Sequence, residues 1–174
     1  MKIIKTKIKD LLIIKKETFK DKRGFLRELY RENLLSKKFI FEIISYSRKN
    51  VIRGLHLQAK NSQGKYVSVL KGKAFDVAVD LRKGSKTFGQ YFSIILSEKQ
   101  NESFYIPEGF AHGFCALENN TIMHYKCTNY RDEKSELGII WNDPRLNIKW
   151  PIKKPIISKR DKKNLNFEDL IDRL

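Results

Sequence analysis

The sequence predicts an all-β fold, either a sandwich or a barrel. Short runs rich in β-branched and aromatic residues recur along the 174-residue chain, and turn residues end them at strand-and-turn spacing. No long helical pattern alternates with these runs, so a parallel α/β sheet is not expected. The length suits a single domain over residues 1–174, with a few short helices.

The predicted elements follow from these runs and from the turn residues, such as Gly72 and Gly84, that separate them. In chain order, the predicted strands are residues 11–14, 39–47, 65–70, 74–81, 90–96, 103–106, 113–117, 121–127 and 139–141. Helical segments are predicted at residues 31–37, 97–100 and 167–174. Asn166 is expected to cap the last of these helices at its N-terminus.

The charge of the chain is strongly positive, with a formal net charge of +16 from 36 Lys and Arg against 20 Asp and Glu. Such a charge could serve nucleic-acid binding. The lysines are spread along the chain, however, and no zinc-finger, helix-turn-helix or RNA-binding motif is present. We therefore expect no nucleic-acid partner, and we expect the charge to attract an anionic small molecule.

The sequence gives no sign of membrane insertion or secretion. It has no apolar run of about 18 residues, and its first residues lack the apolar region and cleavage site of a signal peptide. A cytoplasmic location without membrane contact is expected. The two cysteines, Cys115 and Cys127, lie in strand-like runs without metal-ligand spacing and are expected to be buried free thiols.

Three histidines are candidates for chemistry: His56, His112 and His124. Strict strand alternation puts Arg53 and His56 on opposite faces. Gly54 lies between them and permits a bulge, which would let both side chains enter one cavity. His124 alternates with Tyr125, so it is expected on the other face, in a structural or surface role.

The segment before His112 resembles the second half-motif of cupin barrels, a strand and a Pro-Glu-Gly turn followed by a histidine that points into the barrel. Metal-binding cupins supply a His-x-His pair from the first half-motif, but here the pair reads His56-Leu57-Gln58. Zinc and iron usually take three or four protein ligands. The sequence therefore predicts a barrel without a catalytic metal.

Six motifs together resemble the dTDP-4-dehydrorhamnose 3,5-epimerase family of sugar-nucleotide epimerases, and the similarity runs from about residue 19 to 161. They are residues 21–28 (DKRGFLRE), 51–58 (VIRGLHLQ), 63–67 (QGKYV), 75–82 (FDVAVDLR), 106–114 (IPEGFAHGF) and 141–144 (WNDP). The resemblance implies a cupin jelly-roll barrel, usually a homodimer. It also implies cofactor-independent epimerisation at C3 and/or C5 of a nucleotide-linked 4-keto sugar, in the synthesis of surface-polysaccharide sugars.

The resemblance also implies roles for individual residues. His56 matches the general base and Asp161 its orienting partner, while Tyr125 matches the general acid and Lys65 the lysine beside the substrate carbonyl. The remaining matches are ligand contacts: Arg53 and His112 near diphosphate and sugar, Arg23 and Glu28 at the nucleotide across the dimer, Glu136 and Arg160 at two further positions, and Tyr130 stacked on the base. These roles suit the chemistry, because a C4 ketone acidifies C3–H and C5–H and a neutral imidazole can remove such a proton.

Two positions depart from the family pattern. The family often has Gln-x-Asn about fifteen residues before the catalytic histidine, and the matching residues here are the apolar Phe41 and Ile43. The nucleotide and the sugar therefore stay open, and a branch that acts on GDP-linked heptoses or deoxysugars is an alternative. A non-catalytic cupin that binds a nucleotide sugar is the alternative from a different functional class.

Overall fold

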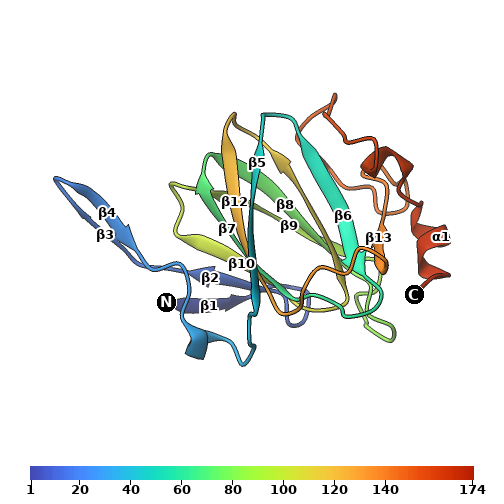
Figure 1. The fold of residues 1–174 in the computed structure, drawn as a ribbon, viewed down its shortest axis with the longest axis horizontal. Coiled ribbons are helices and arrows are strands. Elements are labelled where there is room, and N and C mark those ends of the chain that lie inside the picture. The colour runs from blue at the N-terminus through green and yellow to red at the C-terminus, as the bar shows by residue number, and fades with distance from the viewer.

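Two antiparallel sheets face each other in the computed structural model, which describes residues 1–174 (Figure 1). The six-stranded sheet has the order β1 (Lys2–Lys5), β2 (Leu12–Lys15), β10 (Glu102–Ile106), β7 (Lys65–Lys71), β12 (Thr121–Cys127) and β5 (Phe41–Ser47). The five-stranded sheet has the order β13 (Glu136–Gly138), β6 (Ile52–Gln58), β11 (Phe110–Ala116), β8 (Lys73–Asp80) and β9 (Tyr91–Ser97). The prediction of an all-β fold is confirmed.

The main core lies between the two sheets and follows from strand alternation. On β12, Met123, Tyr125 and Cys127 are buried in it, while His124 and Lys126 point to the other face and pair with Glu42. The same period of two is expected wherever one face of a strand is buried. The predicted opposition of His124 and Tyr125 is thus confirmed.

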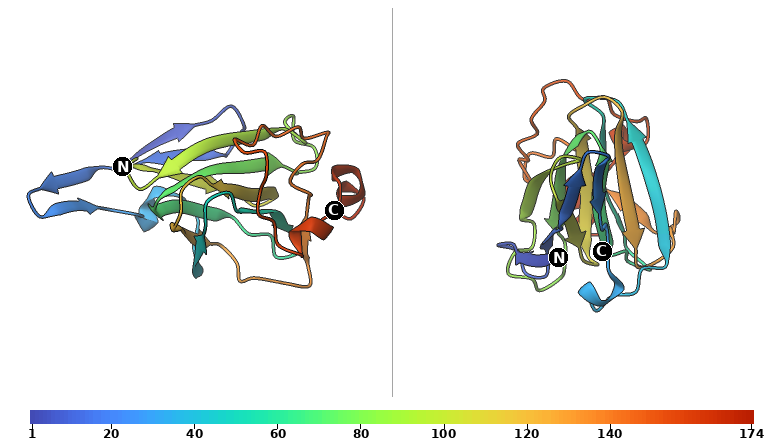
Figure 2. Two further views of the ribbon diagram at one scale, coloured as in Figure 1. Left: turned by 90° about the horizontal axis from the view of Figure 1, so that it is seen from above. Right: turned by 90° about the vertical axis from the view of Figure 1, so that its left-hand side faces the viewer.

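A second apolar layer covers the outside of the five-stranded sheet. Helix α1 (Phe167–Ile171) lies at this end of the molecule (Figure 2). Its Phe167 and Leu170 are fully buried in the layer. Burying an apolar side chain of this size stabilises the fold by about 1.5–3 kcal/mol. Asn166 caps the helix, since its Oδ1 accepts a hydrogen bond from the Asp169 amide at 2.8 Å, as the sequence predicted.

The predicted short helices at other positions are smaller than expected. The segment 31–37 contains only the 3₁₀ helix η1 (Glu32–Leu34), and 97–100 is a single hydrogen-bonded turn. A second 3₁₀ helix, η2 (Asp161–Lys163), follows near the C-terminus. No helix in the structure is long and apolar enough to cross a membrane.

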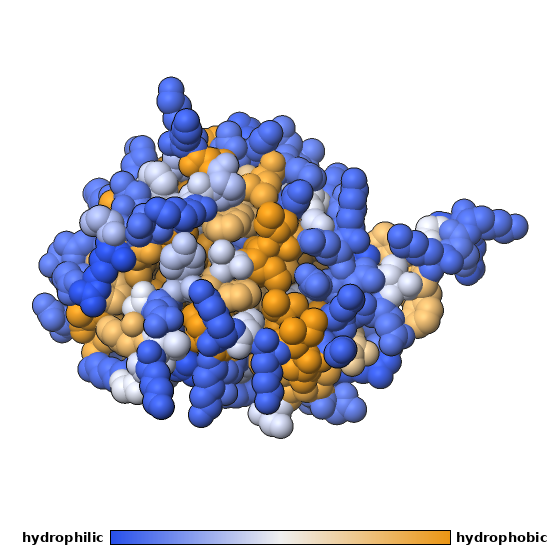
Figure 3. Space-filling view, turned by 180° about the vertical axis from the view of Figure 1, so that it is seen from behind, coloured by the Kyte–Doolittle hydropathy of each residue, from blue (hydrophilic) through white to orange (hydrophobic).

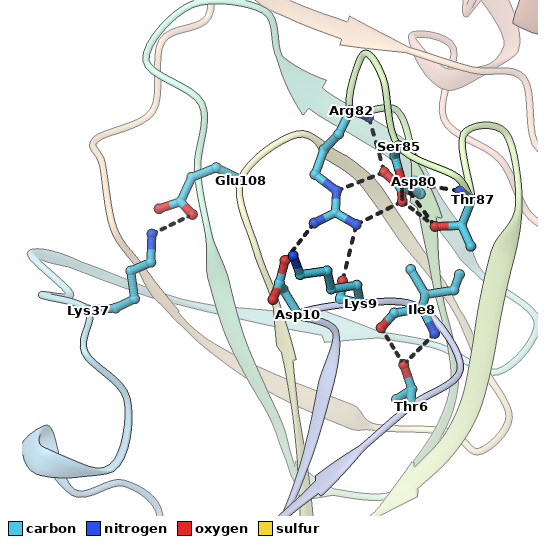
Figure 4. A network of polar contacts seen from close by, with 10 residues as sticks. All are labelled: Thr6, Ile8, Lys9, Asp10, Lys37, Asp80, Arg82, Ser85, Thr87 and Glu108. Carbon is cyan, nitrogen blue, oxygen red and sulfur yellow. Dashed lines mark hydrogen bonds and ion pairs between the residues drawn. The ribbon is translucent and has the colours of Figure 1, made fainter.

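Polar contacts fix the end of β8 to the N-terminal segment (Figure 4). The Asp80 carboxylate is fully buried and accepts hydrogen bonds from Arg82, Ser85 and Thr87. Burial opposes its ionisation, but these bonds outweigh it and lower the pKa of Asp80 to about 2. Arg82 also binds the Asp10 carboxylate at 3.0 Å. This part of the 75–82 motif is therefore structural.

A two-stranded hairpin, β3 (Thr18–Asp21) and β4 (Gly24–Arg27), projects from the body of the protein (Figures 1 and 2). Arg27, at the end of the hairpin nearest the body, donates hydrogen bonds to the Glu98 and Gln100 carbonyls at 2.9 and 3.0 Å. Seen from behind, its tip is hydrophilic and the surface nearer the body is partly hydrophobic (Figure 3). Phe19, Phe25 and Leu26 are 59%, 63% and 70% exposed, so the hairpin presents apolar surface that this chain leaves uncovered.

Candidate active site

A cavity of about 580 Å³ opens into the barrel. Its lining includes most of the residues that the sequence singled out: His56, Lys65, Tyr125, Asp161, Arg53, His112, Glu136 and Arg160. It also includes Ser45, Gln63 and Arg131, which sequence reasoning did not select. The volume lies in the range of small-molecule sites.

Gly54 explains how Arg53 and His56 reach the same cavity. Its φ is +105°, and a Cβ at this position would lie 2.6 Å from the His112 carbonyl oxygen, so only glycine fits. The register between β6 and β11 shifts at this place, between His112 and Phe114. Arg53 is held at the rim by hydrogen bonds to Ser47 Oγ and to a backbone carbonyl. The predicted bulge thus breaks strict alternation.

The His56 imidazole is oriented by a buried carboxylate. Its Nε2 lies 2.7 Å from Asp161 Oδ1, and Asp161 is fixed in turn by a hydrogen bond from its own amide to Ser158 Oγ. Burial alone would raise the pKa of Asp161, but the hydrogen bond from His56 and the His56 charge lower it below its ordinary value. An ionised Asp161 accepts a hydrogen bond from Nε2–H, and in this tautomer the Nδ1 lone pair is available to take a proton.

A second histidine–aspartate pair lies deeper in the barrel. His112 Nε2 lies 2.9 and 3.1 Å from the two Asp76 carboxylate oxygens, and both residues are buried. The Tyr125 ring packs edge-on against His112, with centroids 6.1 Å apart. Asp76 was missed, although it stands in the 75–82 motif, where alternation places it on the same face as the buried Ala78.

Burial disfavours the charged forms of both Tyr125 and Lys65. Burial raises the pKa of Tyr125, and its hydroxyl lies 3.0 Å from Ser45 Oγ. Burial lowers the pKa of Lys65, while the charges of Cys127, Glu136 and Asp76 oppose that shift. Burial therefore keeps the tyrosine protonated above neutral pH, and the neighbouring negative charges offset part of the tendency of the buried lysine to lose its proton.

Gln58 has a structural function in the position where metal-binding cupins have a second histidine. Its Nε2 donates to the Asn61 and Tyr130 carbonyls at 2.7 and 3.3 Å, and its Oε1 accepts from the Asp132 amide at 3.0 Å. The side-chain amide therefore ties β6 to two loops. No group of three or more His, Cys, Asp or Glu side chains has a geometry that could hold a metal ion.

Three of the selected residues lie outside the cavity. Arg23 is on the hairpin and binds Asp21, and Glu28 binds Arg31 just after it. Tyr130 is exposed and packs against Phe41, with ring centroids 5.8 Å apart. The two cysteines are free and buried, as predicted.

Comparisons with known proteins agree on one family. The family model described as dTDP-4-dehydrorhamnose 3,5-epimerase matches residues 5–169. The enzyme of that name from Salmonella typhimurium (strain LT2) is 46% identical over 92% of each chain. That from Neisseria gonorrhoeae is 45% identical over 92% of this chain, which spans only 51% of that relative's length.

A solved structure gives the same result for the fold. The dTDP-6-deoxy-D-glucose-3,5-epimerase of Legionella pneumophila Philadelphia 1, in complex with dTDP-4-keto-L-rhamnose, is 42% identical with a TM-score of 0.93, over 99% of this chain and 95% of that one. This agreement confirms the predicted cupin barrel. The chain belongs to the dTDP-4-dehydrorhamnose 3,5-epimerase family.

Proposed function

We propose that this protein epimerises C3 and/or C5 of a dTDP-linked 4-keto-6-deoxy sugar without a cofactor. The observation that carries the proposal is a single cavity containing the His56–Asp161 pair, Tyr125 and Lys65. A non-catalytic binding protein would have no need of this set. The Legionella relative, solved with a dTDP-linked 4-keto sugar, supports dTDP as the nucleotide.

The proposed reaction passes through an enolate. His56 Nδ1 removes the proton from C3 or C5, and the Asp161 carboxylate stabilises the imidazolium. The Lys65 ammonium lies beside the C4 oxygen and stabilises the negative charge that develops there. The Tyr125 hydroxyl then gives its proton to the opposite face of the carbon, which inverts the centre.

Basic side chains at the cavity suit the diphosphate of the substrate. Arg53 and Arg160 line it and would bind the phosphates, with His112 near the sugar. The net charge of +16 would also speed the encounter with an anionic ligand. Phe41 and Ile43 line the same cavity and leave its β5 wall largely apolar. Because the family often has polar ligand contacts at these two positions, the nucleotide has to be determined by direct measurement.

The function is tested by incubating the purified protein with dTDP- and GDP-linked 4-keto sugars in D₂O and following C3 and C5 by NMR. Deuterium should enter at one or both carbons of a dTDP-linked substrate. Binding without any exchange would favour the non-catalytic alternative, and exchange only with a GDP-linked sugar would overturn the choice of nucleotide. The two buried free thiols suit a cytoplasmic site of action.

We further propose that the protein is a homodimer in which the β3–β4 hairpin contacts the second copy. The exposed Phe19, Phe25 and Leu26 support this, since apolar groups gathered on a projecting element mark an interaction surface. The hairpin would then bring Arg23 and Glu28 towards the partner's nucleotide. Sedimentation should give twice the chain mass of 20.6 kDa, and Phe25→Ser with Leu26→Ser should favour the monomer. A monomer for the wild-type protein would contradict the proposal.

A further inference from the structure

Two arginines lie close to the catalytic histidine, and both bind one carboxylate. Arg131 Nε lies 3.1 Å from Glu136 Oε2, and Arg160 Nη2 lies 2.8 Å from Glu136 Oε1. The Glu136 side chain is only 9% exposed, so water screens these charges weakly. Glu136 is on β13, opposite Gln58 of β6, and therefore next to the strand that carries His56.

The same carboxylate also faces the histidine. Glu136 Oε1 lies 3.7 Å from His56 Nδ1, the nitrogen that is not bound to Asp161. The oxygen that accepts the Arg160 hydrogen bond is thus also the one nearest to the free nitrogen of the base. Glu136 therefore contacts the two guanidinium groups on one side and the imidazole on the other.

The Glu136 carboxylate bears on two opposing electrostatic requirements of the site. A diphosphate substrate favours arginines near the cavity, but a neighbouring cation disfavours the protonated form of a histidine. Without a carboxylate beside them, Arg131 and Arg160 would make His56 a weaker proton acceptor.

We propose that Glu136 is a positioning residue that acts through His56, because its carboxylate offsets the two arginines and keeps the imidazole able to take a proton beside them. The inference rests on the proposed function only in that His56 is the base. It gives Glu136 an electrostatic role in the substrate-free enzyme, in addition to the ligand contact that the family resemblance implies.

Other charged and titratable groups line the same cavity as His56. They are Asp161 of η2, Lys65 of β7, Arg53 of β6, Tyr125 and Cys127 of β12, and His112 of β11, whose partner is Asp76 of β8. Among them only Asp161 bonds directly to the ring. Asp161 holds Nε2, so Glu136 is the carboxylate on the side of the free nitrogen.

The test is an NMR titration of the His56 ring in the substrate-free enzyme. In Glu136→Gln, the midpoint of its protonation should move to lower pH by about one unit, since Arg160 then has no carboxylate partner, Arg131 keeps only the exposed Glu133, and both cations disfavour the imidazolium. Adding Arg160→Gln to Glu136→Gln should recover much of that shift. An unchanged midpoint in Glu136→Gln, or no recovery in the double variant, would overturn the proposal.

Glu133→Gln is the matched control. Glu133 also binds Arg131, at 2.8 Å, but its side chain is 73% exposed and it makes no ion pair with His56. Its variant removes one carboxylate from Arg131 and should leave the His56 midpoint in place. A shift as large as that of Glu136→Gln would mean that any loss of acidic charge has the same effect, which contradicts a specific role.

The titration also separates this inference from the proposed function. If His56 is the base, the acid limb of kcat/KM in Glu136→Gln should move to lower pH by the same amount as the titration. If the titration moves and the acid limb does not, Glu136 still offsets the arginines but His56 is not the base. If the titration does not move, the role of Glu136 is overturned whatever the activity.

Discussion

His56→Asn is expected to lower both turnover and solvent exchange by about 10² to 10⁴, the usual contribution of a positioned base. The asparagine side chain is too short to reach the place of His56 Nε2, so the 2.7 Å hydrogen bond to Asp161 is lost together with the base. An amide also cannot accept a proton from carbon. The measurement is the rate of deuterium entry at C3 and C5 in D₂O, together with the rate of epimer formation.

His124→Asn is the control for loss of a histidine. His124 lies on the opposite face of β12 and pairs with Glu42, away from the cavity. Its replacement should leave exchange and turnover near the wild-type rates. If His56→Asn keeps its exchange while folding normally, another group removes the proton and the assignment of the base is wrong.

Tyr125→Phe should separate proton removal from inversion. The phenyl ring keeps the edge-on packing against His112, so the cavity should hold its shape. The proton donor for the second face is lost, and inversion should fall by about 10² to 10⁴. Exchange catalysed by His56 should persist, because the base and Lys65 remain. The ratio of deuterium entry to epimer formation, measured in one NMR experiment, reports the separation.

The rate of inversion by the wild-type enzyme should depend on pH as expected if Tyr125 is the proton donor. Burial raises the pKa of Tyr125, so the protonated form that donates persists to higher pH than in an ordinary tyrosine.

Ser45→Ala, which removes the hydroxyl 3.0 Å from Tyr125, should reduce inversion less than Tyr125→Phe does. Equal losses of exchange and inversion in Tyr125→Phe would mean that the tyrosine is not the separate donor.

The sequence predicted most strands of the two sheets but missed β6 (Ile52–Gln58), where Gly54 interrupts the alternation, and the exposed strands β1, β3 and β4. On β12 the burial alternates residue by residue, and the predicted bounds agree with the structure. The residues of β1 are all exposed and those of β3 and β4 are mostly exposed, so no alternation reveals them. The strand predicted at 139–141 is misplaced, because pairing with β6 occupies Glu136–Gly138 and only Ile139 forms a bridge beyond it.

Some residues of the candidate active site could be predicted from local sequence, and others could not. Gly54 between Arg53 and His56 predicted a shared cavity from local sequence alone. Asp161 lies 105 residues from His56, and only the family resemblance connected the two. Arg131 and Ser45 reach the cavity through tertiary packing, which no local spacing could indicate.

Gln58 limits the routes by which this barrel can change its chemistry. A histidine there would restore the pair found in metal-binding cupins, but it would first remove an amide that makes three hydrogen bonds to two loops. Each lost bond costs about 1 kcal/mol, a large share of the stability margin of a small protein. A single substitution towards a metal site would therefore weaken the scaffold before any ligand set was complete.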